Sequence, residues 1–221
     1  MTELPTLRTP RPGPGRPRNP EMQGRILRVA QALFATRGFD GVAMEEIQRE
    51  AGTSRATIYV HFASKQELFK AALEDLLAKL PPASDLAPEV SGRPIAEELL
   101  DIAKRLNHLL SSASFELVRR ALASDIPTPL RERIWNTAGR PYFQAIDDYL
   151  FVQARRGMLT LQDSRSAASL FLALVAGGES IRLQWTGASL GLVEDDYLRE
   201  AVEMFVERHA AQPTLGMPMT P

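Results

Sequence analysis

Hydrophobic residues recur along most of the chain at the three- and four-residue spacing of a helix. Between Glu21 and Arg37 they form one apolar stripe, which predicts an amphipathic helix that ends at Gly38. Shorter helices are predicted over 44–51 and 54–61. A fourth starts at Ser64, which forms a capping box with Glu67, and its stripe continues to Leu80 before two prolines. This pattern predicts an all-α fold.

Residues 81–93 contain three prolines and a glycine, so we interpret them as a connection between two helical regions. Beyond Pro94 the helical pattern resumes, and no alternating stretch typical of a strand is found. Prolines and glycines, among them Gly139 and Pro141, are expected to separate the helices. The predicted segments are 94–112, 114–124, 129–138, 141–156, 163–185 and 194–210.

The two ends of the chain differ in composition from the rest. Residues 1–20 are rich in Pro, Gly and Arg and are expected to form a disordered basic arm, and 212–221 a disordered tail. The arm has no apolar core of the kind found in signal peptides, and no run of about 18 apolar residues predicts a membrane span. The absence of cysteine excludes disulfides and agrees with a cytoplasmic location.

The net charge of −1 hides an asymmetry between the two parts of the chain. Residues 1–80 contain 12 Lys and Arg against 9 Asp and Glu, a net of +3, whereas the remainder contains 14 against 18, a net of −4. The difference is small, but it directs any nucleic-acid role to the N-terminal third.

Residues 44–61 have the pattern of a helix-turn-helix. An amphipathic helix is followed by Ala51-Gly52 for a tight turn, and Thr53-Ser54 can cap the next helix. In such a motif the second helix enters the major groove of DNA. Ile58 and Phe62 are spaced to face the core, which leaves the other side of this helix free.

The free side of the 54–61 helix has side chains suited to DNA. Arg55 can contact guanine bidentately, and the small Ala56 permits close approach to the bases. Phosphate contacts are expected from Thr57, Tyr59, His61 and Lys65, and backbone amides near the start of the next helix can add to them. A packing role for Tyr59 and His61 is the alternative. The predicted DNA-binding set is Thr53, Ser54, Arg55, Ala56, Thr57, Tyr59, His61 and Lys65.

The arm adds two further candidates, Arg16 and Arg18. An extended Gly-Arg-Pro segment fits a narrow minor groove, where Arg meets a strong negative potential. A flexible, solubilising extension explains the same composition, and both interpretations remain open.

The run from Gly38 to Leu68, GFDGVAMEEIQREAGTSRATIYVHFASKQEL, resembles the TetR family of bacterial regulators, and the resemblance spans about residues 21–77. A weaker resemblance to one of the family's ligand-domain subtypes covers about 115–209. The residues that carry the first resemblance are Gly38, Phe39, Ile47, Ala51, Gly52, Ser54, Thr57, Tyr59, His61, Phe62, Ser64, Lys65 and Leu68.

This resemblance implies an N-terminal three-helix helix-turn-helix DNA-binding domain (21–80), followed by a larger helical ligand-binding and dimerisation domain (94–211). It implies a homodimer that binds double-stranded operator DNA and responds to a small-molecule effector. Arg55 and Ala56 match positions that commonly reach bases, and Thr57, Tyr59, His61 and Lys65 match positions that mostly hold phosphates. The sequence departs from the family at Ala43, where Thr or Ser usually caps the second helix, and at Val60, where an aromatic residue or His is common.

The C-terminal aromatic residues are interpreted mainly as core, and some of them as the wall of an effector pocket. Gly177-Gly178 within a helical pattern indicates close helix approach, so we expect dimerisation through 163–185 and 194–210 as a four-helix bundle. The candidate ligand-binding residues are His108, Phe115, Arg119, Trp135, Phe143, Arg182 and Gln184.

The preferred hypothesis is a ligand-responsive repressor that binds a palindromic operator. An activator or a ligand-independent regulator fits the same residues, and a helical protein-interaction module is a further alternative. No catalytic or metal-ligating motif supports an enzyme, and no cofactor is expected.

Overall fold

The computed structural model describes residues 20–87, 91–186 and 195–211; the side chains of 113 and 178–186 lie outside this description. The described chain is helical, with one isolated bridge between Leu159 and Ala210 and no strand, which confirms the all-α fold. The helices are α1 Pro20–Arg37, α2 Met44–Glu50, α3 Arg55–His61, α4 Lys65–Leu77, α5 Ile95–Leu110, α6 Ala113–Ala123, α7 Thr128–Ile134, α8 Arg140–Arg155, α9 Ser164–Thr186 and α10 Asp195–His209, with a 3-10 turn η1 Ala83–Asp85 and a π-helical turn η2 Trp135–Gly139.

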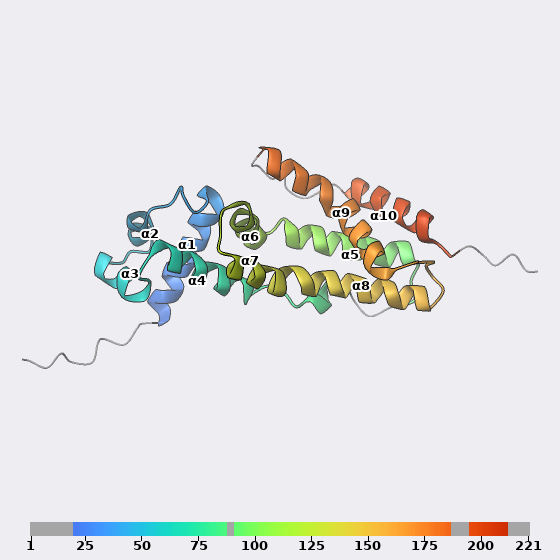
Figure 1. Cartoon of the computed structure of the whole chain (residues 1–221), viewed down its shortest axis with the longest axis horizontal. Coiled ribbons are helices and arrows are strands. Elements are labelled where there is room, and N and C mark those ends of the chain that lie inside the picture. The colour runs from blue at the N-terminus through green and yellow to red at the C-terminus, as the bar shows by residue number, and fades with distance from the viewer. Residues whose placement is uncertain (1–19, 88–90, 187–194, 212–221) are drawn as a thin grey trace, which may run out of the picture.

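Helices α1–α4, here called the head, lie together at one end of the elongated molecule (Figure 1). The apolar stripe of α1 packs against α4, where the rings of Phe34 and Phe69 meet edge to face with centroids 5.0 Å apart. The core of the head continues into α6 and α7, which add Leu117 and Leu130 among others. Apolar contacts therefore couple the head to the next helices of the chain, beyond the 81–93 connection.

Helices α5–α10 form the body, and most of them share a second core. Helix α10 packs against α5 and α9, and α9 packs against α8. The rings of Phe171 and Phe205 meet edge to face at 5.3 Å in its interior. Within this core, α5 and α8 contribute the side chains that position the connection after α4.

The predicted separation of helices at Gly139 and Pro141 is wrong. Helix α7 continues through the π-helical turn η2 directly into α8. A Cβ on Gly139 would lie 2.1 Å from Cε3 of Trp135, so the turn needs glycine because the indole lies over its backbone. Pro141 is tolerated because it falls in the first turn of α8.

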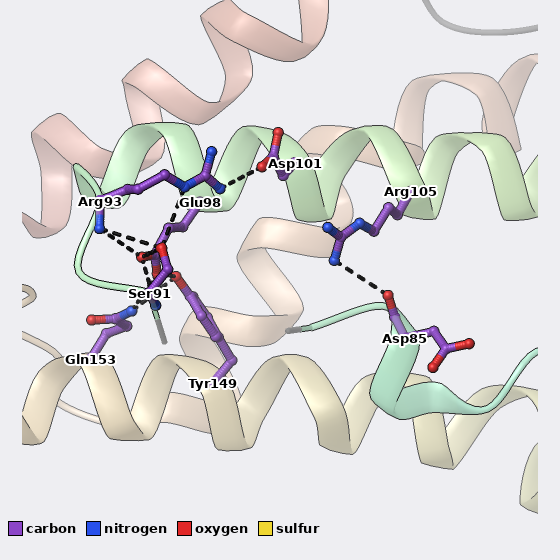
Figure 2. A network of polar contacts seen from close by, with 8 residues as sticks. All are labelled: Asp85, Ser91, Arg93, Glu98, Asp101, Arg105, Tyr149 and Gln153. Atoms are coloured by element: carbon purple, nitrogen blue, oxygen red, sulfur yellow. Dashed lines mark hydrogen bonds and ion pairs between the residues drawn. The ribbon is translucent and has the colours of Figure 1, made fainter. Parts of the chain in front are cut away.

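Residues 91–93 are fastened to the body by one buried carboxylate, that of Glu98 on α5, which is 2% exposed (Figure 2). Its Oε1 accepts hydrogen bonds from the Ser91 amide (3.1 Å), the Ser91 hydroxyl (2.7 Å) and the Arg93 amide (3.2 Å). Its Oε2 accepts from the Tyr149 hydroxyl and from Nε2 of Gln153 (2.9 Å), both on α8. Five donors thus join the connection, α5 and α8 at a single group.

Candidate nucleic-acid interface

The turn between α2 and α3 has the conformation that the sequence predicts. Gly52 has φ +58°, a left-handed conformation that suits glycine, and its amide donates to the carbonyl of Arg49. Nη2 of Arg25 on α1 donates to the Gly52 carbonyl at 3.1 Å. The turn is therefore held both by its own backbone and by the first helix.

Local capping sets the starts of α3 and α4. Oγ of Ser54 accepts from the Thr57 amide at 3.1 Å and lies 2.8 Å from the Thr57 hydroxyl. Oγ of Ser64 accepts from the Glu67 amide at 3.1 Å. The Glu67 carboxylate reaches back to the amide of Ala63 at 3.0 Å, so the capping box includes the residue before the cap.

Helix α3 buries one side and presents the other to solvent. Ile58 is completely buried and Phe62 nearly so, as predicted, whereas Arg55 and Ala56 are exposed. Tyr59 and Val60 are 39% and 56% exposed. The exposed side of α3 is therefore free to contact another molecule, and it mixes a cation with small and apolar groups. We call it the α3 outer face, comprising Arg55, Ala56, Tyr59 and Val60.

A cation–π contact orders part of this face. The guanidinium carbon of Arg55 lies 5.8 Å from the centroid of the Tyr59 ring one turn later. The contact holds the arginine along the helix, so less side-chain freedom is lost when it binds a partner.

The side chains of Lys65, His61 and Thr53 are partly engaged or enclosed. Nζ of Lys65 donates to the Val42 carbonyl at 3.0 Å and lies 4.3 Å from the Phe39 ring centroid, so it braces the loop before α2. Nδ1 of His61 and Oγ1 of Thr53 are buried without a partner in the described chain. The ammonium of Lys65 keeps two further protons for a phosphate, because it can donate three bonds.

The acidic start of α2 is partly neutralised. Glu46 forms an ion pair with Arg37 and lies 3.8 Å from a second guanidinium, that of Arg49. Glu45 is exposed and has no ion pair in the described chain. The negative charge that faces an approaching phosphate is therefore smaller than the sequence suggests.

Helix α2 lacks a side-chain cap, as predicted. Ala43 has the extended conformation of an N-cap residue (φ −101°, ψ 149°) and is exposed, but it offers no oxygen to the free amides of the first turn.

We expect Ala43→Ser to raise the free energy of unfolding by about 1 kcal/mol, because the hydroxyl can accept from one of these amides. Chemical denaturation measures the change. Ala32→Ser, at an exposed position inside α1, is the control and should give no gain; equal effects of both changes would contradict this explanation.

The candidate ligand-binding residues do not converge on one site. His108 lines a cleft of about 540 Å³ between the end of α4 and α5. Phe115 is buried behind that cleft, with its ring 6.5 Å from the ring of Tyr142. Arg119 bonds instead to Glu116 and to a backbone carbonyl, and Phe143 is half-buried against the second core. Trp135 is 51% exposed and is not among the residues that line the cleft. The side chains of Arg182 and Gln184 lie outside the description, as do Arg16 and Arg18 of the arm altogether.

Of the residues that line this cleft only His108 was predicted from the sequence, and those that were missed include Lys104, Arg105 and Tyr142. Arg105 and His108 lie three residues apart on one helix, a spacing that places both on the same face and could have pointed to them. Tyr142 could not be found in this way, because its partner is the Pro81 carbonyl, 61 residues earlier.

Neither a metal site nor a membrane-spanning helix is found in the part of the chain that the structure describes. Among those residues, no group of His, Cys, Asp and Glu side chains is arranged to hold a metal ion. None of their helices combines the length and apolar character that crossing a bilayer requires.

Comparison with protein families gives two matches. A model described as bacterial regulatory proteins of the tetR family matches residues 26–72, and one for the C-terminal domain of AefR-like transcriptional repressors matches 97–211. Together they cover the head and nearly the whole body.

Curated relatives agree with these matches. The transcriptional regulator CymR of Pseudomonas putida is 30% identical over 179 residues, which span 75% of this chain and 80% of that protein. The transcriptional activator FasR of Mycolicibacterium smegmatis is 41% identical over 54 residues, 24% of this chain. The matches to FasR and to the Bacillus subtilis regulator YerO cover only 25% and 28% of those proteins.

Solved structures share the fold. A TetR regulator from Agrobacterium tumefaciens has a TM-score of 0.72 at 20% identity, covering 87% of this chain and 96% of that one. A regulator from Saccharomonospora viridis, solved in complex with choline, has a TM-score of 0.67 at 24% identity, covering 88% and 100%.

Proposed function

The chain belongs to the TetR family of bacterial helix-turn-helix transcriptional regulators, and from this premise we propose that it is a ligand-responsive repressor that binds a palindromic operator as a homodimer. The observation that carries the proposal is the α3 outer face. A helix that buries Ile58 and exposes Arg55, Ala56, Tyr59 and Val60 has the shape and chemistry to enter a major groove.

The side chains of this face and of its surroundings divide between contacts to bases and contacts to the DNA backbone. Arg55 and Ala56 are proposed to approach base edges, where Arg can bind guanine bidentately. Val60 offers an apolar contact of the kind that suits a thymine methyl group. Contacts to phosphates are proposed to fix the register of α3 in the groove. The residues proposed to make them are Thr57, Tyr59, His61 and Lys65, with Thr53 and Ser54 at the turn. Arg16 and Arg18 are proposed to add minor-groove contacts.

The homodimer is supported by the surface of the last helices. Three large apolar side chains are exposed there: Leu170 on α9 (43%), and Tyr197 (44%) and Met204 (55%) on α10. A Cβ on Gly177 would meet only the Cβ of Ala173, at 4.0 Å, so no other described helix of the same protomer uses the space beside this glycine. A second copy packed there would bury these apolar groups. Binding to a palindrome would then require the two α3 helices to lie roughly 34–36 Å apart, one turn of DNA.

Effector control requires a ligand that binds two head arrangements with different affinity. The 540 Å³ cleft at the end of α4 is the proposed effector site, because α4 belongs to the head and leads directly into the cleft wall. As a regulator of bacterial DNA, the protein is proposed to act in the cytoplasm.

An electrophoretic mobility-shift assay on the DNA upstream of the protein's own gene tests this function. The full-length protein should shift one fragment, and binding should weaken steeply with salt, because phosphate contacts release counterions. Arg55→Ala should weaken the shift about tenfold or more, since a bidentate arginine–guanine pair is worth about 1–3 kcal/mol. Mixing two copies of different length should add one band of intermediate mobility, as expected for a dimer.

Arg156→Ala is the matched control, because Arg156 is an exposed arginine at the end of α8 in the body. A shift that does not depend on salt, or that both substitutions weaken equally, would favour the helical protein-interaction module. In cells, deletion of the gene should raise transcription next to the operator; a fall would indicate an activator.

A further inference from the structure

The cleft at the end of α4 has walls of two kinds. Its surface is mostly apolar, contributed by Leu80, Pro81 and Leu86 on the side of the connection and by Leu109 and Tyr142 on the opposite side. At about 540 Å³ it lies within the range of ligand-sized pockets. An occupant therefore needs a sizeable apolar body.

The polar side chains of the cleft include three cations, together with one carboxylate, one histidine and two serines; they are Lys79, Lys104, Arg105, Asp85, His108, Ser112 and Ser114. Lys79 and Lys104 line it, but both already form ion pairs at 2.5 Å, with Asp75 and Asp195 respectively. Arg105 and His108, on one face of α5, make no ion pair in the described chain.

Arg105 has a weak and replaceable partner. Its Nη1 donates to the backbone carbonyl of Asp85 at 3.4 Å, beyond the usual range of a good N–H···O bond. Figure 2 shows the guanidinium directed at that carbonyl, while the Asp85 carboxylate turns away from it. The guanidinium therefore lies at the cleft without an ion pair in the described chain, although the Asp85 carboxylate also lines this cleft.

We propose that the effector cleft selects an amphipathic anion, with an apolar body against the leucine, proline and tyrosine walls and a carboxylate bound by Arg105 and His108. A carboxylate bonded to a guanidinium forms a stronger bond than the neutral carbonyl that Arg105 now holds. The regulatory role of this anion rests on the proposed function, but its binding does not.

The same arginine links the ligand to the head. The segment that leaves α4 is held by two bonds across the cleft, from Arg105 to the Asp85 carbonyl and from the Tyr142 hydroxyl to the Pro81 carbonyl. A carboxylate that recruits Arg105 removes the first bond, so that η1 keeps only its packing against α8 and the bond from Tyr142 to the segment before it. Because α4 begins at Lys65, directly after α3, a shift of its C-terminal end changes the position of α3.

A second cavity of about 560 Å³, between α4 and the α6–α7 loop, provides an internal contrast. It is also partly apolar, but its carboxylates outnumber its cations, so it disfavours an anion. Its charged lining residues are Asp40, Glu67, Glu74, Asp125, Lys70 and Arg133.

Isothermal titration of the full-length protein with matched probes tests the proposal. The probes are naphthalene-2-carboxylate and decanoate, each with its neutral amide. Each carboxylate should bind about tenfold more tightly than its amide, because an ionised acceptor strengthens the bond to Arg105. Arg105→Gln should remove this preference, while Arg156→Gln and Asp125→Asn, the latter in the second cavity, should keep it.

Equal binding of carboxylate and amide, a preference that survives Arg105→Gln, or no binding of any probe at millimolar concentration would overturn the proposal. Mobility-shift assays with the same probes distinguish a failure of the proposed ligand class from a failure of the proposed effector control. If the carboxylates bind through Arg105 but do not release DNA, effector control fails and the ligand class stands. If operator binding is controlled by the amides instead, the ligand class fails and the proposed function stands.

Discussion

Ala56→Asp should abolish specific operator binding and leave the fold intact. Ala56 is exposed on the α3 outer face, so the new carboxylate replaces no packed atom. In the groove it would meet phosphates and electronegative base edges, and a like-charge contact of this kind costs several kcal/mol. We expect a loss of about a hundredfold or more in affinity, since each 1.4 kcal/mol is about tenfold. A mobility-shift titration at fixed salt measures it.

The control for this change is Ala123→Asp, the same substitution at an exposed alanine at the end of α6, in the body. It should bind DNA as the unmodified protein does, and both variants should melt close to it. If Ala56→Asp retained operator affinity within a few fold, α3 would not be the helix that enters the groove.

Glu98→Ala should be among the most destabilising single substitutions in the body. It removes the acceptor of five hydrogen bonds and leaves the Ser91, Arg93, Tyr149 and Gln153 donors without it. Each buried donor that stays unsatisfied costs about 1–3 kcal/mol, so we expect a loss of about 3 kcal/mol or more in the free energy of unfolding.

Chemical denaturation measures this loss, and Glu97→Ala provides the control, because Glu97 is the exposed neighbour on the same helix. That variant should change stability by less than about 0.5 kcal/mol. Similar losses in the two variants would show that the hydrogen-bond cluster contributes little.

The pH dependence of stability gives an independent signature of Glu98. Burial raises the pKa of its carboxyl, but the hydrogen bonds from Tyr149, Ser91 and Arg93 lower it by more, so the pKa of Glu98 lies below its ordinary value. Burial, together with the bond to Glu98, raises the pKa of Tyr149, so the phenol remains a donor.

The sign of the effect follows from the lowered pKa of Glu98. As the pH falls, the Glu98 carboxylate is protonated at a higher pH in the unfolded state than in the folded state. The contribution of the ionised Glu98 to the free energy of unfolding is therefore fully present above the ordinary pKa of a glutamate. It is lost as the pH falls toward the pKa that Glu98 has in the folded state. The stability difference between the unmodified protein and Glu98→Gln should shrink between about pH 6 and pH 3.5, and a constant difference would contradict it.

Short-range features of the head could be predicted from sequence because their partners are neighbours. The bonds from the Thr57 amide to Ser54 and from the Glu67 amide to Ser64 span three residues, and the turn at Gly52 needs only its own conformation. The burial of Ile58 opposite the exposed Arg55 follows from helical period alone. The all-α fold and the α3 outer face were therefore within reach of periodicity and capping.

Helix continuity and the cleft were harder to predict. Glycine and proline near 139–141 usually mark a break, but the Trp135 ring over Gly139 allows a π-helical turn to continue. The cleft depends on the end of α4 meeting α5, α6 and α8, and most of the residues chosen for a pocket by type alone lie elsewhere.

The sequence by itself determined which faces of which helices are apolar, where the head helices start, and which side of α3 is free for DNA. Only the tertiary structure decided what those faces meet: Glu98 with donors 51 and 55 residues away, Lys65 with the Val42 carbonyl, and Arg105 opposite Asp85. The physical reason is that periodicity shows only whether a position prefers water or the interior. Any apolar partner can satisfy a position that prefers the interior. The choice of a partner depends on packing between distant segments, which one helix's own pattern does not encode.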